Sequence, residues 1–322
     1  MAVYTKLTKE EIANHLKQNY QIGELQDFKE IVAGIDNSNF VISSDKKYIL
    51  TIFESRIKPE ELPFFIDLKG HLSLKGVRCP KPILNNAGSS ISDLKGKKSS
   101  IVTFLEGTML EPRQDGLYES ITPKHCFEVG KTAAQMHLAA QDFDQNRFND
   151  VGVFGFDELL GKFRHLMEGY QPGLLEKIDT QIESLTSSWK KDLPNVAAHL
   201  DLFPDNVFFD ENQNLSGVID FYFAANDLMI YDFAVIVNAW CFDENIEFTE
   251  EKYAQMLKGY ESVRPFSDPE TDFLNTALQA ASMRFLLTRL HDMFFTPKDS
   301  LVNVKDPAEY LKKIEFFSKA SV

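Results

Sequence analysis

Residues 196–223, which read VAAHLDLFPDNVFFDENQNLSGVIDFYF, limit what this chain can fold into more than any other stretch. Two short apolar runs, at 207–209 and 217–219, stand on either side of DENQN, a cluster of turn-forming residues. Apolar runs separated by such a cluster are typical of a β-hairpin. The stretch therefore predicts two antiparallel strands, with the midpoint of the hairpin at residue 213.

Asn206 and Asp220 lie at equal sequence distances from this midpoint, so we expect them to face each other at the open end of the hairpin. Directly opposed residues of antiparallel strands have Cα atoms ~4.5–5.5 Å apart. Mg²⁺ is usually held by one or two carboxylates, and nucleotide phosphates complete its ligands. We therefore predict a magnesium site at Asn206 and Asp220. Asp201, on the loop that enters the hairpin, is left to accept a proton from an attacking hydroxyl group.

The order His199, Asp201, Asn206, hairpin and Asp220-Phe has the spacing of a kinase catalytic loop and of the Asp-Phe strand end that follows it. An ordinary surface hairpin with acidic turn residues is the alternative interpretation. The complete set favours phosphoryl transfer, with ATP and Mg²⁺ as the cofactors.

The chain has 322 residues, of which 43% are hydrophobic and 25% charged, and this is long enough for two lobes of a globular protein. Its net charge of −14 argues against a nucleic acid or an anionic membrane as partner, because no face is expected to be basic enough to neutralise phosphates. Length, composition and charge leave the oligomeric state open.

Cys79, Cys126 and Cys241 are widely spaced, which fits reduced thiols and indicates neither a disulfide framework nor a zinc cluster. The N-terminal residues lack the apolar core of a secretion signal. The apolar stretch at 222–242 is interrupted by too many polar residues to span a membrane. We therefore expect a cytoplasmic protein without a membrane segment.

The first hundred residues are rich in predicted strands. Thr8 opens a capping box and a helix to about residue 19, and a second helix is expected at 59–74. Strands are expected at 28–32, 40–43, 48–53, 91–94 and 99–104. The loop at 34–39 lies where a nucleotide-covering loop would be, so Asn37, Ser38 and Asn39 are predicted to donate hydrogen bonds to phosphate oxygens. An ordinary hairpin turn is the alternative.

The letters FLEG, at 104–107, indicate a change from strand to turn that fits a hinge between two lobes. From the order of the elements, we expect the Phe104 carbonyl and the Leu105 amide to meet the adenine of ATP. Beyond this point helices are predicted at 122–141, 174–189, 232–240, 250–260, 269–291 and 307–318. The fold class is therefore α+β, with a small antiparallel-sheet lobe at 1–105 and a larger, mostly helical lobe at 106–322.

The chain resembles the aminoglycoside-phosphotransferase-like (choline-kinase-like) small-molecule kinases over nearly its whole length. HLDLFPDN and IDFYFA are specific for this family, and NAWCFD, RPF and FLLTRLHD point to its homoserine kinase branch. The resemblance implies a bilobal, protein-kinase-like fold that uses ATP and Mg²⁺. It also implies that Asp201 is the catalytic base, that Asn206 and Asp220 hold the metal, and that His199 and Asp232 support the catalytic loop.

One position departs from the usual kinase pattern. Kinases of this shape place a Lys or Arg on the third strand to hold nucleotide phosphates, whereas the matching strand here, YILTIFE, has Thr51. Either metal and loop donors hold the nucleotide, or Arg56 or Lys58 replaces the cation. The departure also leaves open a catalytically inactive, nucleotide-binding regulator.

The homoserine kinase branch implies an amino-acid substrate, L-homoserine, whose side-chain hydroxyl is phosphorylated. Such a substrate needs a cation for its carboxylate and an acceptor for its ammonium group. The candidate contacts are Tyr222, Asn238, Trp240, Arg284 and Arg289. The two arginines are five positions apart, about 140° around a helix, so both cannot easily face one small ligand. A kinase for choline or an aminoglycoside is the alternative.

Overall fold

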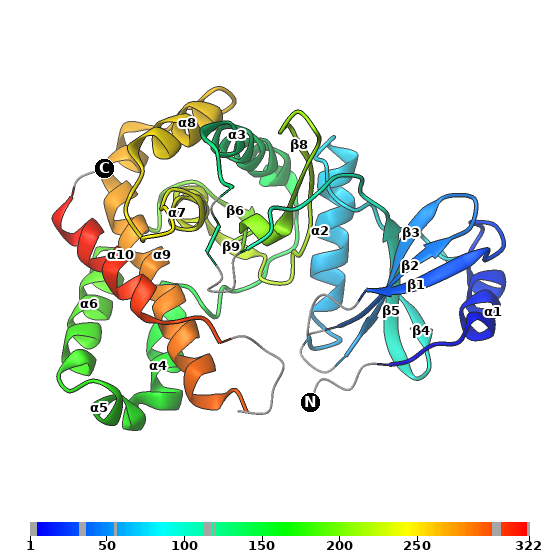
Figure 1. Ribbon diagram of the computed structural model, residues 1–322, viewed down its shortest axis with the longest axis horizontal. Coiled ribbons are helices and arrows are strands. Elements are labelled where there is room, and N and C mark those ends of the chain that lie inside the picture. Colours follow the sequence, from blue (N-terminus) through cyan, green and yellow to red (C-terminus); the bar gives the residue numbers. More distant parts are fainter. Residues whose placement is uncertain are drawn as a thin grey trace. The chain divides into compact units, whose positions relative to one another are not determined.

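The computed structural model describes residues 5–31, 37–54, 57–112, 117–118, 120–297 and 304–320. The chain forms two compact units, the first comprising Met1–Gly107 and Ser216–Tyr222, the second Thr108–Leu215 and Phe223–Val322 (Figure 1). The predicted lobe boundary after residue 105 lies two residues before the end of the first segment. The return of Ser216–Tyr222 to the first unit is not indicated by the sequence.

The first unit is built on a sheet that, in the described residues, has five antiparallel strands in the order β1-β2-β3-β5-β4. The strands are β1 (Asp27–Ile31), β2 (Asn37–Ser43), β3 (Lys47–Phe53), β4 (Ser92–Leu94) and β5 (Lys97–Thr103). Phe40 pairs with Leu50, which in turn pairs with Ile101, and all three side chains are buried in one cluster. Because alternate residues of a strand point to the same face, these pairs build an apolar face.

Helix α1 (Lys9–Asn19) packs on this apolar face through Ile12 and Leu16, which belong to the same cluster. Its start is the predicted capping box: Thr8 Oγ1 accepts a hydrogen bond from the Glu11 amide, and the Glu11 carboxylate accepts one from the Thr8 amide. The prediction of this helix is therefore confirmed at both ends.

Helix α2 (Leu62–Leu74) packs Leu62 and Ile66 against Phe53 at the end of β3. It begins three residues later than predicted, because residues 59–61 form a turn ahead of it. The segment Ser216–Tyr222 joins this unit through hydrogen bonds at two places. The Val218 amide donates to the Arg78 carbonyl (2.8 Å), and Ser216 Oγ donates to the Glu106 carbonyl (2.8 Å).

The second unit is mostly helical, as predicted. Its longer helices are α3 (Pro123–Ala139), α4 (Phe156–Phe163), α6 (Leu174–Ser188), α7 (Met229–Trp240), α8 (Glu250–Glu261), α9 (Asp268–Phe295) and α10 (Ala308–Lys319), with a short α5 (Met167–Tyr170). Strands β6 (Asn195–Ala198) and β9 (Ala225–Leu228) pair antiparallel. Helix α7 is buried and contacts α3, α8 and α9 around it (Figure 1). The α+β prediction is confirmed.

Helices α3 and α8 approach each other at two glycines. A Cβ atom on Gly130 would lie 2.1 Å from the Met256 carbonyl oxygen, and one on Gly259 would lie 2.1 Å from the Phe127 carbonyl oxygen. Each glycine therefore lies directly against the backbone of the other helix, and no larger residue fits without moving the helices apart.

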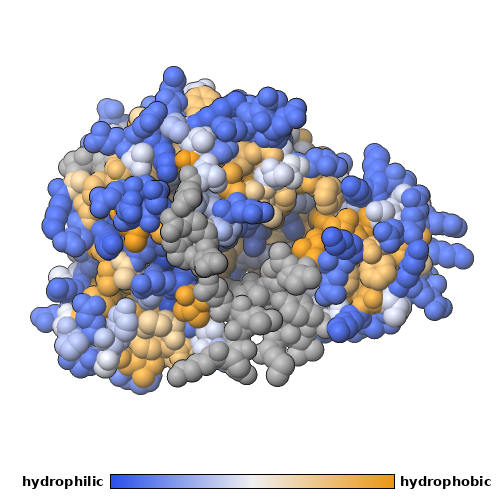
Figure 2. Space-filling model, viewed as in Figure 1, coloured by the Kyte–Doolittle hydropathy of each residue, from blue (hydrophilic) through white to orange (hydrophobic). Residues whose placement is uncertain are grey.

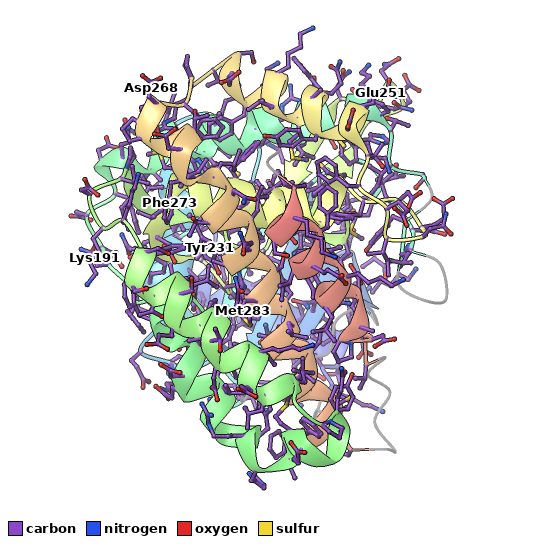
Figure 3. All side chains as sticks on the ribbon, turned by 90° about the vertical axis from the view of Figure 1, so that its left-hand side faces the viewer. Lys191, Tyr231, Glu251, Asp268, Phe273 and Met283 are labelled. Carbon is purple, nitrogen blue, oxygen red and sulfur yellow. The ribbon has the colours of Figure 1, made fainter. Side chains whose placement is uncertain are left out.

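Helices α9 and α10 lie side by side at the C-terminal part of the second unit (Figure 1), and Figure 3 shows Asp268, Phe273 and Met283 in order along α9. Hydrophilic residues cover much of the visible surface of both units (Figure 2). No helix among the described residues is long and apolar enough to cross a membrane.

The predicted hairpin is confirmed. Strands β7 (Val207–Phe209) and β8 (Leu215–Val218) form a two-stranded sheet, and β8 begins two residues earlier than expected. The Asp210 carboxylate closes the turn by accepting hydrogen bonds from the Asn212 and Asn214 amides, each 2.8 Å long. Gln213 adopts the left-handed φ of 60° that the turn requires.

Candidate functional site

The loop between β6 and β7 carries the predicted catalytic residues of the second unit. Leu200 has a φ of 61°, in the left-handed region that disfavours a residue with a branched side chain. Its amide donates to Asp232 Oδ1 (2.7 Å), and its carbonyl accepts a hydrogen bond from Arg284 Nη1. Buried groups thus hold both sides of this strained residue, as is common at functional sites.

Asp201 follows Leu200, and its side chain is 19% exposed, so it can reach a ligand. Its Oδ1 lies 3.8 Å from Arg284 Nη2. The Asp201 amide donates to Nδ1 of the buried His199 (3.2 Å), which leaves the ring proton of a neutral His199 on Nε2. His199 therefore supports the loop backbone.

Asn206 lies beside Asp201. Its Nδ2 donates to the Asp201 carbonyl (2.8 Å) and makes a longer contact with Asp201 Oδ2 (3.4 Å). Because the amide nitrogen faces Asp201, the Oδ1 end of Asn206 is the end that can bind a cation. The structure brings Asp201 and Asn206 together within the second unit. Asp220 belongs to the first unit, and its opposition to Asn206 stays a prediction.

A series of buried hydrogen bonds connects the loop to helices α7 and α3. The fully buried Asp232 accepts hydrogen bonds from the Leu200 amide and from His137 Nε2 (2.8 Å), and His137 Nδ1 lies 2.7 Å from the Tyr260 hydroxyl. Burial acts to raise the pKa of Asp232, but the hydrogen bond from His137 and the other donors outweigh it and lower the pKa. Asp232 is therefore a buried carboxylate that positions the loop.

From the sequence, His137 is expected only to pack in the core, because it lies between apolar residues of a predicted helix. The structure gives it a specific polar role, because its two ring nitrogens link Asp232 to Tyr260. Arg264 Nη1 extends the network by donating to the Tyr260 hydroxyl (3.2 Å), and its Nη2 pairs with Glu270 (2.7 Å). These contacts join residues more than a hundred positions apart.

Four of the predicted substrate contacts lie within the second unit. Trp240 is fully buried and its Nε1 donates to the Leu202 carbonyl (2.7 Å), so it also supports the loop. Asn238 is fully buried, donates to the Ala234 and Leu278 carbonyls, and accepts from Ser282. Arg284 is buried against the loop. Arg289 donates to the Asp306 carbonyl (2.8 Å) and pairs with Glu309 (2.5 Å).

The remaining candidate, Tyr222, lies in an aromatic cluster of the first unit. Its ring contacts Phe53 and Phe65 edge to face, with centroids 6.0 and 5.7 Å away. Lys69 Nζ, on α2, lies 5.2 Å from the centre of the Tyr222 ring. Asp220, two residues before Tyr222, has a left-handed φ of 62°.

Lys69 is a buried cation beside Tyr222 that the sequence does not reveal. Its side chain is 6% exposed, and burial lowers its pKa to about 8 against electrostatic attraction from Cys79 and Asp220. Among the described residues its ammonium group has a ring contact but no carboxylate at ion-pair distance. A lysine on an apolar helix is the only signal in the sequence, and it does not indicate burial.

The predicted phosphate-binding residues lie in a strand, and the prediction that they lie in a loop is wrong. Asn37, Ser38 and Asn39 lie in strand β2, and the other residues of the expected loop, 34–36, lie outside the described residues. Ser38 Oγ donates to the Glu54 carboxylate (2.7 Å), and Asn37 Oδ1 accepts from the Glu54 amide (3.3 Å). The strand is longer than expected because these polar side chains are satisfied within the sheet.

Thr51, at the position where a cation is expected, faces Asn39 on the neighbouring strand and donates to its Oδ1 (2.8 Å). The hydroxyl is thus used by the sheet. Of the two replacements considered from the sequence, Lys58 is exposed and Arg56 lies outside the described residues.

The predicted hinge residues follow strand β5. The Phe104 amide donates weakly to the Lys47 carbonyl (3.4 Å), and the Leu105 side chain packs on Gly217, where a Cβ atom would meet Leu105 Cδ1 at 2.6 Å. Within the described part of the chain, the Phe104 carbonyl and the Leu105 amide have no hydrogen-bond partner. Both groups can therefore pair with a ligand.

Comparison with known proteins gives a family and a fold. Residues 27–266 match the model of the phosphotransferase enzyme family. The chain is 42% identical to a homoserine kinase of Agrobacterium fabrum over 317 residues, which cover 98% of this chain and 95% of the relative. It is 40% identical to a homoserine kinase of Rhodospirillum rubrum over 322 residues, covering 100% and 97% of the two chains.

Similar solved structures include an amicoumacin kinase in complex with AMP-PNP and Ca²⁺, at 15% identity and a TM-score of 0.67, covering 97% of this chain and 92% of the other. A spectinomycin phosphotransferase in complex with ADP gives 15% identity and a TM-score of 0.65, covering 98% and 95%. An ethanolamine kinase of Plasmodium vivax is 16% identical with a TM-score of 0.62, and the match covers 95% of this chain and 85% of the kinase. At these identities the similarity shows the fold, and it confirms the predicted kinase-like fold class.

Proposed function

Because this chain belongs to the phosphotransferase enzyme family, we propose that it transfers the γ-phosphoryl group of ATP to the side-chain hydroxyl of L-homoserine. The observation that carries this proposal is the near-full-length similarity, at about 40% identity, to proteins named homoserine kinases. The loop at Asp201 supplies the groups that such a transfer needs. ATP as co-substrate fits a cytoplasmic location.

Asp201 acts as the base that orients the substrate hydroxyl and accepts its proton. Its carboxylate is partly exposed, which allows contact with the substrate, and Arg284 restrains it from the buried side. Little covalent chemistry is required of the protein in phosphoryl transfer, so positioning and charge neutralisation dominate. The support of Leu200 and Leu202 by α7 and α9 serves this positioning.

Asn206 and Asp220 are the proposed ligands of Mg²⁺. The amide orientation of Asn206 fits this role, since its nitrogen is occupied by Asp201 and its oxygen is the end a hard cation prefers. When bound, the metal neutralises charge on the phosphate oxygens.

For the nucleotide, we assign adenine to the Phe104 carbonyl and the Leu105 amide, and the phosphate-side cation to Lys69. Lys69 is buried beside Tyr222 and is attracted electrostatically by Asp220, a proposed metal ligand. It thereby supplies the positive charge that Thr51 cannot. Asn37, Ser38 and Asn39 act at the start of β2, next to the loop expected to cover the phosphates.

The structure also suggests a revision of the substrate contacts. Asn238 and Trp240 are fully buried with their polar groups satisfied, so we propose that they support the loop and the packing of α7. Arg284 positions Asp201. Arg289, at the edge of a cavity, remains the candidate for contact with the amino acid.

A coupled ADP-release assay with homoserine, choline, serine and kanamycin tests the proposal. We expect release with homoserine and a loss of about 10²–10⁴-fold in kcat for Asp201→Asn, with ATP binding retained. Glu211→Gln, at an exposed position of the hairpin turn, is the control and is expected to match the parent protein. Release with choline or kanamycin instead would identify another small-molecule kinase. Release with none of the four would favour a nucleotide-binding regulator.

A further inference from the structure

A small cavity of the second unit lies between α7, α9 and α10 and offers about 30 Å³ of free space. Its wall includes the apolar residues Phe203, Ile121 and Phe242. It also carries an unusual number of charged side chains for so small a space: Asp243, Arg289, Lys305, Glu309 and Lys313.

The two acidic residues of this wall are already satisfied. Glu309 accepts hydrogen bonds from Arg289 Nη1 and Lys313 Nζ, each 2.5 Å long. Asp243 Oδ1 accepts from the Asn245 and Glu247 amides, at 2.9 and 2.8 Å. Neither carboxylate therefore needs a further cation.

Arg289 and Lys313 are paired with Glu309, so Lys305 is the remaining cation of the wall. Its Nζ lies 5.8 Å from the centre of the Phe203 ring, and among the described residues it has no carboxylate partner. Arg289, Lys305 and Lys313 against two carboxylates give the wall a positive balance, and a wall of this charge favours an anion.

The cavity adjoins the catalytic loop. Phe203 follows Asp201 by two residues, and its amide donates to the Asp201 carbonyl (2.8 Å). The Phe203 ring packs on Phe285, with centroids 4.9 Å apart, and the neighbouring Arg284 contacts Asp201. Phe203 therefore links the wall of the cavity to the loop that carries the proposed base.

The size of the cavity limits what it can hold. About 30 Å³ accommodates two or three non-hydrogen atoms, by comparison with the space that a buried water needs. A carboxylate group has a size and a charge that fit this space.

We propose that this cavity, which we call the carboxylate pocket, binds the α-carboxylate of the amino-acid substrate through Lys305, with Arg289 beside it. The assignment rests on the proposed function, because it places the carboxylate end of the substrate here and its hydroxyl at Asp201. The pocket then selects amino-acid alcohols over amines such as choline that lack a carboxylate. Arg289 is held in place by Glu309 and by the Tyr310 ring, 4.5 Å away.

Lys305→Met tests the pocket with little risk to folding, because Lys305 makes no ion pair that its loss would break. We expect the KM for homoserine to rise about ten- to a hundredfold, as for the loss of a charge-assisted hydrogen bond, with the KM for ATP unchanged. Lys305→Arg should recover part of the loss. Lys312→Met, an exposed lysine of α10, is the matched control and should change neither constant.

A binding measurement separates this inference from the proposed function. Calorimetry with 4-hydroxybutyrate and with uncharged 1,4-butanediol, in the presence of AMP-PNP and Mg²⁺, requires no turnover. We expect the parent protein to prefer the carboxylate and Lys305→Met to lose that preference. Equal preference in both proteins would overturn the carboxylate pocket, even if homoserine is phosphorylated. Absence of homoserine turnover with a preference that depends on Lys305 would overturn the proposed function alone.

Discussion

The ion pairs of Glu309 should make the second unit less stable at acid pH than at neutral pH. Glu309 is 14% exposed and lies 2.5 Å from both Arg289 Nη1 and Lys313 Nζ. Burial acts to raise the pKa of its carboxyl group, but the two cations outweigh burial and lower the pKa from 4.5 to about 2. This difference corresponds to about 3 kcal/mol of folding free energy.

The sign follows from where the proton binds. Between pH 4.5 and about 2 the unfolded chain takes up a proton on Glu309 that the folded chain still excludes. The stabilisation is therefore fully present above pH 4.5 and is lost as the pH falls towards 2. Glu309→Gln mimics the protonated form, so it should destabilise the protein by about 3 kcal/mol near neutral pH and by little near pH 2.

Urea unfolding at several pH values between 2 and 7, followed by tryptophan fluorescence, measures this difference. The chain has two tryptophans, Trp189 and Trp240, and both belong to the second unit, so the signal reports on the unit that holds Glu309. Glu315→Gln, in an exposed pair with Lys319, serves as the control and should show no such pH dependence. A difference between Glu309→Gln and the parent that stays constant from pH 7 to pH 2 would refute the reasoning.

Two further substitutions test the packing and the nucleotide side. Gly130→Ala should destabilise the protein by about 3 kcal/mol, because the new Cβ meets the Met256 carbonyl at 2.1 Å; Gly161→Ala, with nothing within 4 Å, should be neutral or slightly stabilising in the same urea experiment. Equal effects of the two alanines would count against the close helix contact. Lys69→Met should raise the KM for ATP about tenfold or more without changing adenosine affinity, whereas Lys98→Met, in an exposed pair with Asp93, should leave both unchanged. An unaltered KM for ATP in Lys69→Met would remove Lys69 from the nucleotide site.

The features that the sequence predicts well are those set by neighbouring residues. The hairpin at 207–218 follows from turn residues between apolar runs, and Asp210 closes that turn with hydrogen bonds to residues two and four positions ahead. The capping box at Thr8 is equally local. Asp201 and Asn206 lie together because they are only five positions apart in one loop.

Features that depend on residues far apart in the chain could not be predicted from the sequence. His137 meets Asp232 across 95 positions, and Lys69 is buried by residues that are remote in the chain. Strand β2 begins earlier than predicted because Asn39 is satisfied by Thr51 on the next strand, so polar residues that suggest a loop belong to the sheet. No local pattern records these pairings.

The membership of Ser216–Tyr222 in the first unit bears on how the protein is made. A ribosome that has finished Gly107 must add 115 more residues to reach Tyr222. At typical synthesis rates this takes roughly ten seconds, during which the aromatic cluster of Phe53 and Phe65 lacks its third ring. A chain truncated after Gly107 would remain in that incomplete state, so the first third of the chain expressed alone is not expected to form a stable unit.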